Sequence, residues 1–274
     1  MNRGYGKHAG VLVSSVVIAG FTASTARAQD PAPSPVWYFR LGVIDIESQV
    51  DSSSFDLAVR AIPGVTFGSG PLPNDAVGVE PLTLVGGSVG VVLPVLDHRL
   101  AIETIVALPK KPKVILTGTL ATESILPTVF GIPTGIPPLG RDLAEVSGLP
   151  PMFTVVYRAP SLGPVTPILG AGGIALLFAD VQVTNPLLNR ISKVEFDFPP
   201  SFGLIAQVGA DVHLWGPVQA RFDVKYMSLA TNFTIKNIQI KTGLPVVGDL
   251  DVGDAEVRAS FHAWLVHLGV GVDF

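Results

Sequence analysis

Charged and polar residues stand at every second position in several segments. Arg221, Asp223 and Lys225 alternate with apolar residues, and Gln207 and Asp211 do so in the preceding segment. Alternate residues of a β-strand point to the same side of a sheet, so each set shares one face. Cations and carboxylates that share an enclosed face neutralise one another in charge-assisted hydrogen bonds. The residues that we expect in such a polar network, on inward faces of strands, are Arg40, Glu103, Arg158, Gln207, Asp211, Arg221, Asp223 and Lys225.

Two short motifs match signatures of enzymes but lack the context that the chemistry needs. Ser88 lies in the G-x-S-x-G run Gly86–Gly90, yet Val91–Leu93 continues as strand where a nucleophile elbow requires a turn and a helix. Gly170–Ala175 matches G-x-G-x-x-A without a convincing helix after it. The histidines that follow the first 28 residues show no spacing typical of metal ligands; they are His98, His213, His262 and His267. We therefore expect no enzymatic activity, no cofactor and no metal site. A membrane lipid hydrolase or acyltransferase of similar size remains the alternative among enzymes, and it would need Ser or His at the outer rim.

The composition is that of a membrane protein without membrane-spanning helices. Of 274 residues, 48% are hydrophobic and only 15% are charged, whereas soluble domains carry about 25% charged residues. Mean hydropathy is +0.50, and the chain has no Cys, which excludes a disulfide scaffold. The chain after residue 28 contains no run of about 18 apolar residues, which a spanning helix would need. These features favour a transmembrane β-barrel, in which every second residue faces lipid.

Residues 1–28 have the layout of a secretory signal peptide. Arg3 and Lys7 precede the apolar run Ala9–Phe21, and Ala26-Arg27-Ala28 supplies a small-residue cleavage site. We expect cleavage before Gln29. The remaining chain has 15 basic and 22 acidic residues. It therefore lacks the clustered positive charge of a nucleic-acid-binding protein.

The segments that must position the polar residues alternate with a period of two. At the C-terminus the apolar set is Trp264, Val266, Leu268, Val270, Val272 and Phe274. Similar runs lie near 37–44, 82–93, 100–108, 153–158, 166–179, 206–214 and 218–226. The pattern predicts an all-β fold, an eight-stranded antiparallel transmembrane β-barrel that forms a single domain over residues 29–274. A soluble lipocalin-like barrel would carry charge on its outer face, and this chain does not.

The connections between these runs alternate in length. Pro94–Arg99, Ala159–Pro164 and Trp215–Pro217 are short turns. The other connections, near 47–81, 110–150, 180–200 and 234–255, are long and are expected as outer loops. Short periplasmic turns and long outer loops are typical of outer-membrane barrels. At the start of the second loop, Lys110, Lys111 and Lys113 form a basic rim for lipopolysaccharide phosphates, or simply an ordinary solvated loop.

The order of these segments resembles the OmpW family of small outer-membrane barrels. The similarity lies in Leu100–Pro109, Leu149–Tyr157, Thr166–Gly173, Ser201–Asp211, Val224–Thr231 and Gly269–Phe274. It covers most of residues 37–274, and the longer Pro/Gly segments around 63–79 and 125–143 depart from the family pattern, as does Lys225. The resemblance implies a bacterial outer-membrane location and the uptake of small hydrophobic molecules.

The interior of an eight-stranded barrel is barely wide enough for side chains or one small ligand. Arg221, Asp223 and Lys225 belong to the half next to the short turns, and inward Met227 and Leu229 follow. The sequence thus predicts a lumen that is polar below and apolar above, which receives a hydrophobic molecule from outside and releases it sideways into the bilayer. The alternative is a closed structural or surface-interaction barrel without transport activity. Expected partners are outer-membrane lipids, lipopolysaccharide, small hydrophobic solutes and the barrel assembly machinery, which would recognise Phe274.

Overall fold

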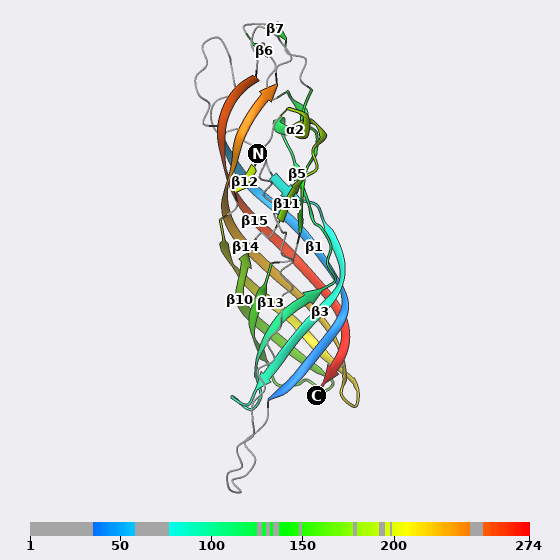
Figure 1. Cartoon of the computed structure of the whole chain (residues 1–274). Helices are drawn as coiled ribbons and strands as arrows, with labels where there is room; N and C mark the ends of the chain where they lie inside the picture. The colour runs from blue at the N-terminus through cyan, green and yellow to red at the C-terminus, as the bar shows by residue number, and fades with distance from the viewer. Residues whose placement is uncertain are drawn as a thin grey trace, which may run out of the picture. The chain divides into compact units, whose positions relative to one another are not determined.

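A computed structural model shows a closed antiparallel β-barrel (Figure 1). It describes residues 35–57, 77–124, 128–129, 132–133, 137–147, 150–177, 180–191, 195–197, 199–241 and 249–274. The expected signal peptide lies outside these residues. The eight barrel strands are β1 (Val36–Leu57), β3 (Leu82–Leu93), β4 (Leu100–Ala107), β9 (Met152–Arg158), β10 (Val165–Leu176), β13 (Ser201–Trp215), β14 (Val218–Lys241) and β15 (Asp249–Asp273). The predicted fold class is confirmed.

The barrel closes because its first and last strands pair. The strands run in the order β14-β13-β10-β9-β4-β3-β1-β15, and β14 also pairs with β15. Tyr38 lies opposite Asp273 in the β1–β15 ladder. Beyond it, the backbone amides of Trp37 and Phe274 donate to each other's carbonyl oxygens, both at 2.8 Å. Closure therefore extends to the last residue of the chain and leaves this end of the sheet without an unpaired edge.

One end of the barrel carries the three short turns. Pro94–Arg99 joins β3 to β4, with Leu96, Asp97 and His98 at positive φ, and Gly163 and Gly216 take positive φ in the other two turns. The start of β1, near Trp37, and the end of β15, near Phe274, also lie at this end of the barrel. We call it the turn end.

At the opposite end, the loop end, the connections contain structure of their own. A separate antiparallel sheet has the order β11-β8-β5-β2, formed by β11 (Asp180–Val183), β8 (Asp142–Ser147), β5 (Lys113–Leu116) and β2 (Val77–Val79). We call this four-stranded sheet the cap. The remaining elements are α1 (Thr119–Thr122), β6 (Thr128–Val129), β7 (Ile132–Pro133), α2 (Pro186–Ile191) and β12 (Glu195–Asp197), which pairs with β14.

The loops expected from sequence therefore differ from those observed. β1 continues to Leu57, inside the range 47–81. β14 continues to Lys241 and β15 starts at Asp249, so both strands extend into the range 234–255. The ranges 110–150 and 180–200 hold cap strands and short helices rather than irregular chain alone.

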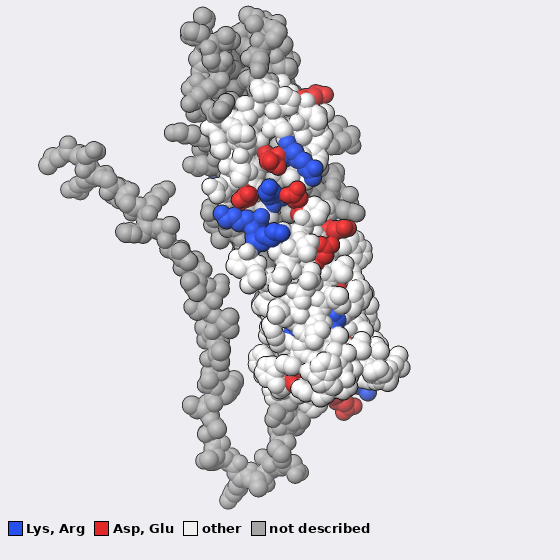
Figure 2. Space-filling model, turned by 90° about the vertical axis from the view of Figure 1, so that its right-hand side faces the viewer, with Lys and Arg blue, Asp and Glu red and all other residues white. Residues whose placement is uncertain are grey.

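Apolar side chains cover the outer face of the barrel wall. Trp264, Val266, Leu268, Val270, Val272 and Phe274 are all exposed, as the sequence predicts for residues that face lipid. Figure 2 shows charged side chains gathered towards the two ends, with little charge on the wall between them. Lys110, Lys111 and Lys113 are exposed, and the Lys110 ammonium donates to the carbonyl of Thr83 at 3.2 Å. Among the described residues, no helix is long and apolar enough to span a membrane.

Candidate functional site

The turn-end half of the barrel interior is filled by charged side chains, which we call the plug. Its centre is Arg221 on β14, which is 1% exposed. The Arg221 guanidinium donates from Nε and Nη2 to the two carboxylate oxygens of Asp211, both at 2.7 Å. Its Nη1 donates to Glu103 and, at 3.3 Å, to the hydroxyl of Ser88. Arg221 thus joins β14 to β13, β4 and β3 across the interior.

A second group of charges surrounds Lys225, one step closer to the loop end. The Lys225 ammonium lies 2.8 Å from Glu103 Oε1 and 3.0 Å from Asp223 Oδ1. The other Asp223 oxygen lies 3.0 Å from His267 Nδ1. Gln207 donates to Glu103 at 3.2 Å and to Asp223 at 3.3 Å. Each carboxylate is therefore held by several donors, as buried charge requires.

The end of the plug nearest the turns is closed by two further arginines. Arg40 contacts Asp273 at 2.5 Å and Asp211 at 3.8 Å. Arg158 lies 3.6 Å from Asp211 and 3.7 Å from Asp273. The plug then has four cations, Arg40, Arg158, Arg221 and Lys225, and four carboxylates, Glu103, Asp211, Asp223 and Asp273. Leaving His267 aside, the formal charges of these eight side chains balance.

Tyr38 is a plug residue that our sequence reasoning missed. Its hydroxyl donates to Glu103 at 2.8 Å, and the Arg221 and Arg40 guanidinium carbons lie 5.0 and 5.2 Å from its ring centroid. Gly90 makes room for this ring, because a Cβ there would lie 2.2 Å from Tyr38 Cζ. Asp273 and His267 were missed as well. All three stand at the alternate positions of their strands that face the interior, as the predicted residues do. This position in the strand is the signal that could have identified them.

All eight polar residues predicted for the interior lie in this plug. Seven are buried, and Arg158 at the turn end is half-buried. Ser88 lies in the middle of β3, which runs without a break to Leu93, so the turn and helix of a nucleophile elbow are missing there. Its hydroxyl instead receives the Arg221 hydrogen bond.

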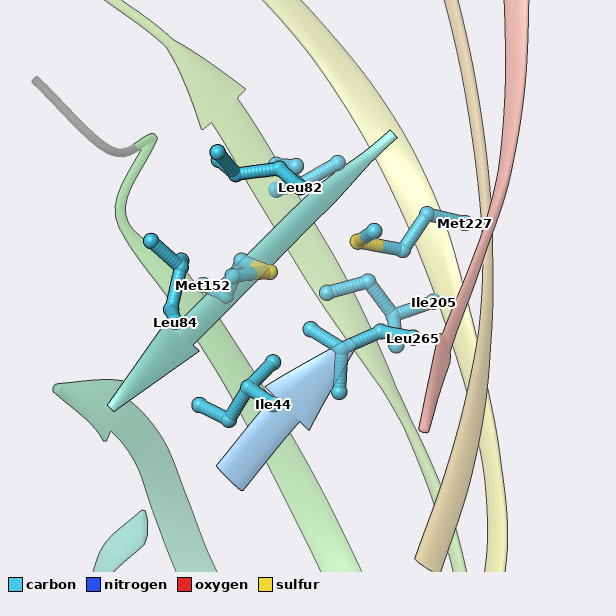
Figure 3. Packing of buried hydrophobic residues seen from close by; sticks show 8 residues of the cluster. Ile44, Leu82, Leu84, Met152, Ile205, Met227 and Leu265 are labelled. Carbon is cyan, nitrogen blue, oxygen red and sulfur yellow. The ribbon is translucent and has the colours of Figure 1, made fainter. Parts of the chain in front are cut away.

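Above the plug, towards the loop end, the interior becomes apolar. Ile44, Leu82, Leu84, Met152, Ile174, Ile205, Met227 and Leu265 form one buried cluster, which we call the floor. Figure 3 shows these side chains converging from different strands. The floor follows the plug directly, since Met227 is the next inward residue of β14 after Lys225.

A cavity of about 200 Å³ lies between the floor and the cap. Its wall includes Ile46, Met152, Ile174, Met227, Leu229 and Phe261, and its roof includes Val79, Val114, Ala144, Val146 and Val181 of the cap. The lining is almost entirely apolar. Both residues predicted for an apolar lumen, Met227 and Leu229, are buried and line this cavity.

Asn185 connects the cap to its neighbouring helix. Its side-chain oxygen accepts from the amides of Leu187 and Leu188, both at 3.0 Å, as an N-cap of α2. Its side-chain amide donates to the carbonyls of Leu139 at 2.8 Å and Asp142 at 2.6 Å. Asn185 is 1% exposed, so these four hydrogen bonds satisfy a buried amide and fix α2 to the start of β8.

The polarity of both faces changes at the same level of the wall. On β14 the outward residues are apolar up to Tyr226, and Ser228 and Asn232 follow. The inward residues of β14 are charged up to Lys225 and become apolar from Met227. On β15 the outward face likewise changes from Trp264 to His262 and Ser260. Tyr226 and Trp264 contact each other with ring centroids 4.9 Å apart, and the Tyr226 hydroxyl lies 2.8 Å from His262 Nδ1.

Comparisons with known proteins agree with this architecture. The model of the OmpW family matches residues 61–274, and no curated protein matches. The crystal structure of the outer membrane protein OprG from Pseudomonas aeruginosa is 18% identical with a TM-score of 0.62, covering 88% of this chain and 96% of that chain. The structure of AlkL in lipid bilayers is 18% identical (TM-score 0.49; 93% and 97% covered), and so is the E. coli Outer Membrane Protein W (TM-score 0.44; 87% and 97% covered).

Proposed function

The chain belongs to the OmpW family of bacterial outer-membrane barrels, and from this premise we propose that it takes up small hydrophobic molecules from outside the cell. One observation carries the proposal: an apolar cavity of about 200 Å³ lies on the floor, above a closed, charge-balanced plug. An apolar solute gains by leaving water for such a cavity, since burial is worth about 25 cal/mol per Å² of apolar surface.

The position of the cavity along the barrel supports this function. Aromatic side chains gather at the membrane–water boundary in outer-membrane barrels, and Tyr226 and Trp264 occupy that place on β14 and β15. Leu229 and Phe233 lie on the loop-end side of this level, where β14 turns Ser228 and Asn232 outward while the neighbouring strand β13 still exposes Leu204. The upper barrel therefore encloses an apolar interior behind an outer wall of mixed polarity.

A sideways exit is favoured by the wall between β4 and β9. The ladder between these strands ends at Thr104 and Phe153, although β4 continues to Ala107. Pro150 and Pro151 precede β9, and proline has no N–H to extend the ladder. Beyond Thr104, Ile105 and Ala107 pack against the floor while Val106 and Leu108 are exposed on the outer wall. Beyond this point β4 and β9 are not joined by a ladder, so side chains alone separate the floor from the outer face between these two strands.

The straight route is closed, because a solute moving down from the cavity would meet the floor and then the plug. This same feature favours the alternative of a closed structural barrel, which the plug would equally stabilise. Uptake into liposomes separates the two functions. We expect apolar solutes to enter protein-containing liposomes faster than protein-free ones, with little ionic current in planar bilayers. Equal rates would support the closed barrel, and large steady currents would indicate a water-filled pore.

The exit is tested separately by Pro150→Val, which supplies an N–H on the β4 side of β9. If the ladder then extends towards Ala107, uptake slows while the barrel stays folded. Pro160→Val in a turn-end connection is the matched control and should leave uptake unchanged. Unchanged uptake in a folded Pro150→Val variant with a demonstrably longer ladder would contradict exit at this place.

A further inference from the structure

We propose that the cavity beneath the cap binds one monocyclic aromatic hydrocarbon, of the size of benzene to propylbenzene, and discriminates against hydroxylated analogues. The inference rests on the proposed function for its biological meaning, but binding is a property of the cavity alone and is measured without transport.

The size limit follows from the volume. An apolar cavity of about 150 Å³ holds benzene, and the cavity here measures about 200 Å³. The difference leaves room for a few more carbon atoms, so a ligand of about six to nine non-hydrogen atoms fits. A molecule with three fused rings, with about fourteen non-hydrogen atoms, exceeds this size.

The discrimination follows from the hydrogen bonds of the lining. The Ser48 hydroxyl donates to the carbonyl of Val79 at 2.5 Å, and the Thr231 hydroxyl pairs with that of Ser201 at 2.7 Å. Three lining residues have polar side chains, namely Ser48, Thr231 and Glu80; the two hydroxyls already make hydrogen bonds within the protein, and Glu80 is exposed to solvent. A hydroxyl group on the ligand therefore exchanges water for few partners on the lining, which weakens binding by about tenfold or more.

The preference for an aromatic ring follows from the side chains at the wall. The sequence has three methionines, and the two beyond the first residue, Met152 and Met227, both line the cavity and are buried. Thioether sulfur makes favourable contacts with the edges of aromatic rings, and its flexible side chain adapts to ligand shape. Phe233 and Phe261 also line the cavity and offer edge-to-face ring contacts.

The two methionines make the proposal directly testable. We suggest labelling the full barrel with ¹³C-methyl methionine in lipid nanodiscs and assigning the signals with Met152→Leu and Met227→Leu. Toluene should shift both methyl signals along a saturable curve. Benzyl alcohol should need an about tenfold or higher free concentration for the same shift, and anthracene, with three fused rings, should produce no saturable shift.

Toluene also dissolves in lipid, so a pair of variants separates the cavity from the bilayer. Leu229→Phe enlarges a lining side chain and should weaken the saturable shift. Leu204→Phe makes the same change on the outer wall, where Leu204 is exposed, and should leave the shift intact. Ala263→Leu is the larger change in volume, so it removes more of the cavity and should abolish the saturable shift; it is also the second variant if Leu229→Phe fails to fold.

Linear shifts, equal shifts in both variants, equal affinity for toluene and benzyl alcohol, or saturable binding of anthracene would each overturn the proposal. Its failure is distinguishable from failure of the proposed function. Saturable toluene binding without liposome uptake would retain the ligand site and reject transport. Uptake without saturable binding would retain transport and reject the ligand site.

Discussion

Replacing Arg221 with methionine should strongly destabilise the barrel, because Arg221 connects four strands through the plug. The substitution retains much of the side-chain volume but removes hydrogen bonds to Asp211, Glu103 and Ser88. Removing one partner of a buried ion pair typically costs about 3–5 kcal/mol, since the other charge stays buried without compensation.

The remaining contacts place the expected loss at the low end of that range. Asp211 would still have Arg158 at 3.6 Å and Arg40 at 3.8 Å. Glu103 would still accept from Lys225 at 2.8 Å and from the Tyr38 hydroxyl at 2.8 Å. We therefore expect the free energy of unfolding to fall by about 3 kcal/mol.

Urea unfolding in lipid vesicles, followed by tryptophan fluorescence, measures this loss from the shift in midpoint. Lys111→Met removes an exposed cation and should leave the midpoint unchanged. Adding Glu103→Gln to Arg221→Met restores the charge balance and should recover part of the loss. The reasoning is refuted if Arg221→Met unfolds at the wild-type midpoint, or if the double variant is no more stable than the single one.

Three further predictions follow from the closure, the cavity and the cap. Deleting Phe274 removes the terminal backbone pair with Trp37 and the residue that we expect the assembly machinery to recognise, so less heat-modifiable barrel should be found in outer-membrane fractions; wild-type amounts would contradict this. Leu229→Asp places a charge in the cavity and should abolish uptake of an apolar solute while the barrel still folds, whereas Leu229→Met should retain uptake; a folded and active Asp variant would show that solutes take another route. Asn185→Ala removes an N-cap worth about 1 kcal/mol and frees two carbonyls, so amide exchange in β8 should accelerate while protection of β13 stays unchanged, and equal exchange in β8 would rule out this role of Asn185.

The barrel strands were predictable wherever one face is apolar and the other is small or polar. The C-terminal strand shows this alternation without interruption from Val266 onwards, and β4 shows it except at Thr104 and Ile105. On β14 the apolar positions move from even to odd numbers after Tyr226, where inward Met227 and Leu229 start to enclose the cavity. An interpretation that expects apolar residues only at even positions therefore ends the strand there. For this reason the parts of β14 and β15 nearest the loop end were predicted as loop.

The alternation along each strand predicts which charged residues face the interior. It does not predict which cation pairs with which carboxylate. Arg221 and Glu103 are 118 positions apart, and nothing in local spacing says which inward cation meets which carboxylate. The cap was beyond reach for a related reason. Its strands have three to six residues each and come from three separate connections, so none shows enough periodicity to be recognised alone.

The plug also helps to determine which face of each strand points into the lumen and which faces lipid. A buried ion pair is weak support for stability, because desolvation offsets much of the attraction. It is strong support for orientation, however, since a one-residue slip turns every side chain of a strand to the opposite face. Such a slip in β14 would move Arg221 and Lys225 into lipid, at about 2–4 kcal/mol each near the bilayer midplane. With an apolar interior the two faces of the strand would be nearly equivalent, so the charges distinguish the lumen from the lipid below Met227, and the polar outer residues do so above it.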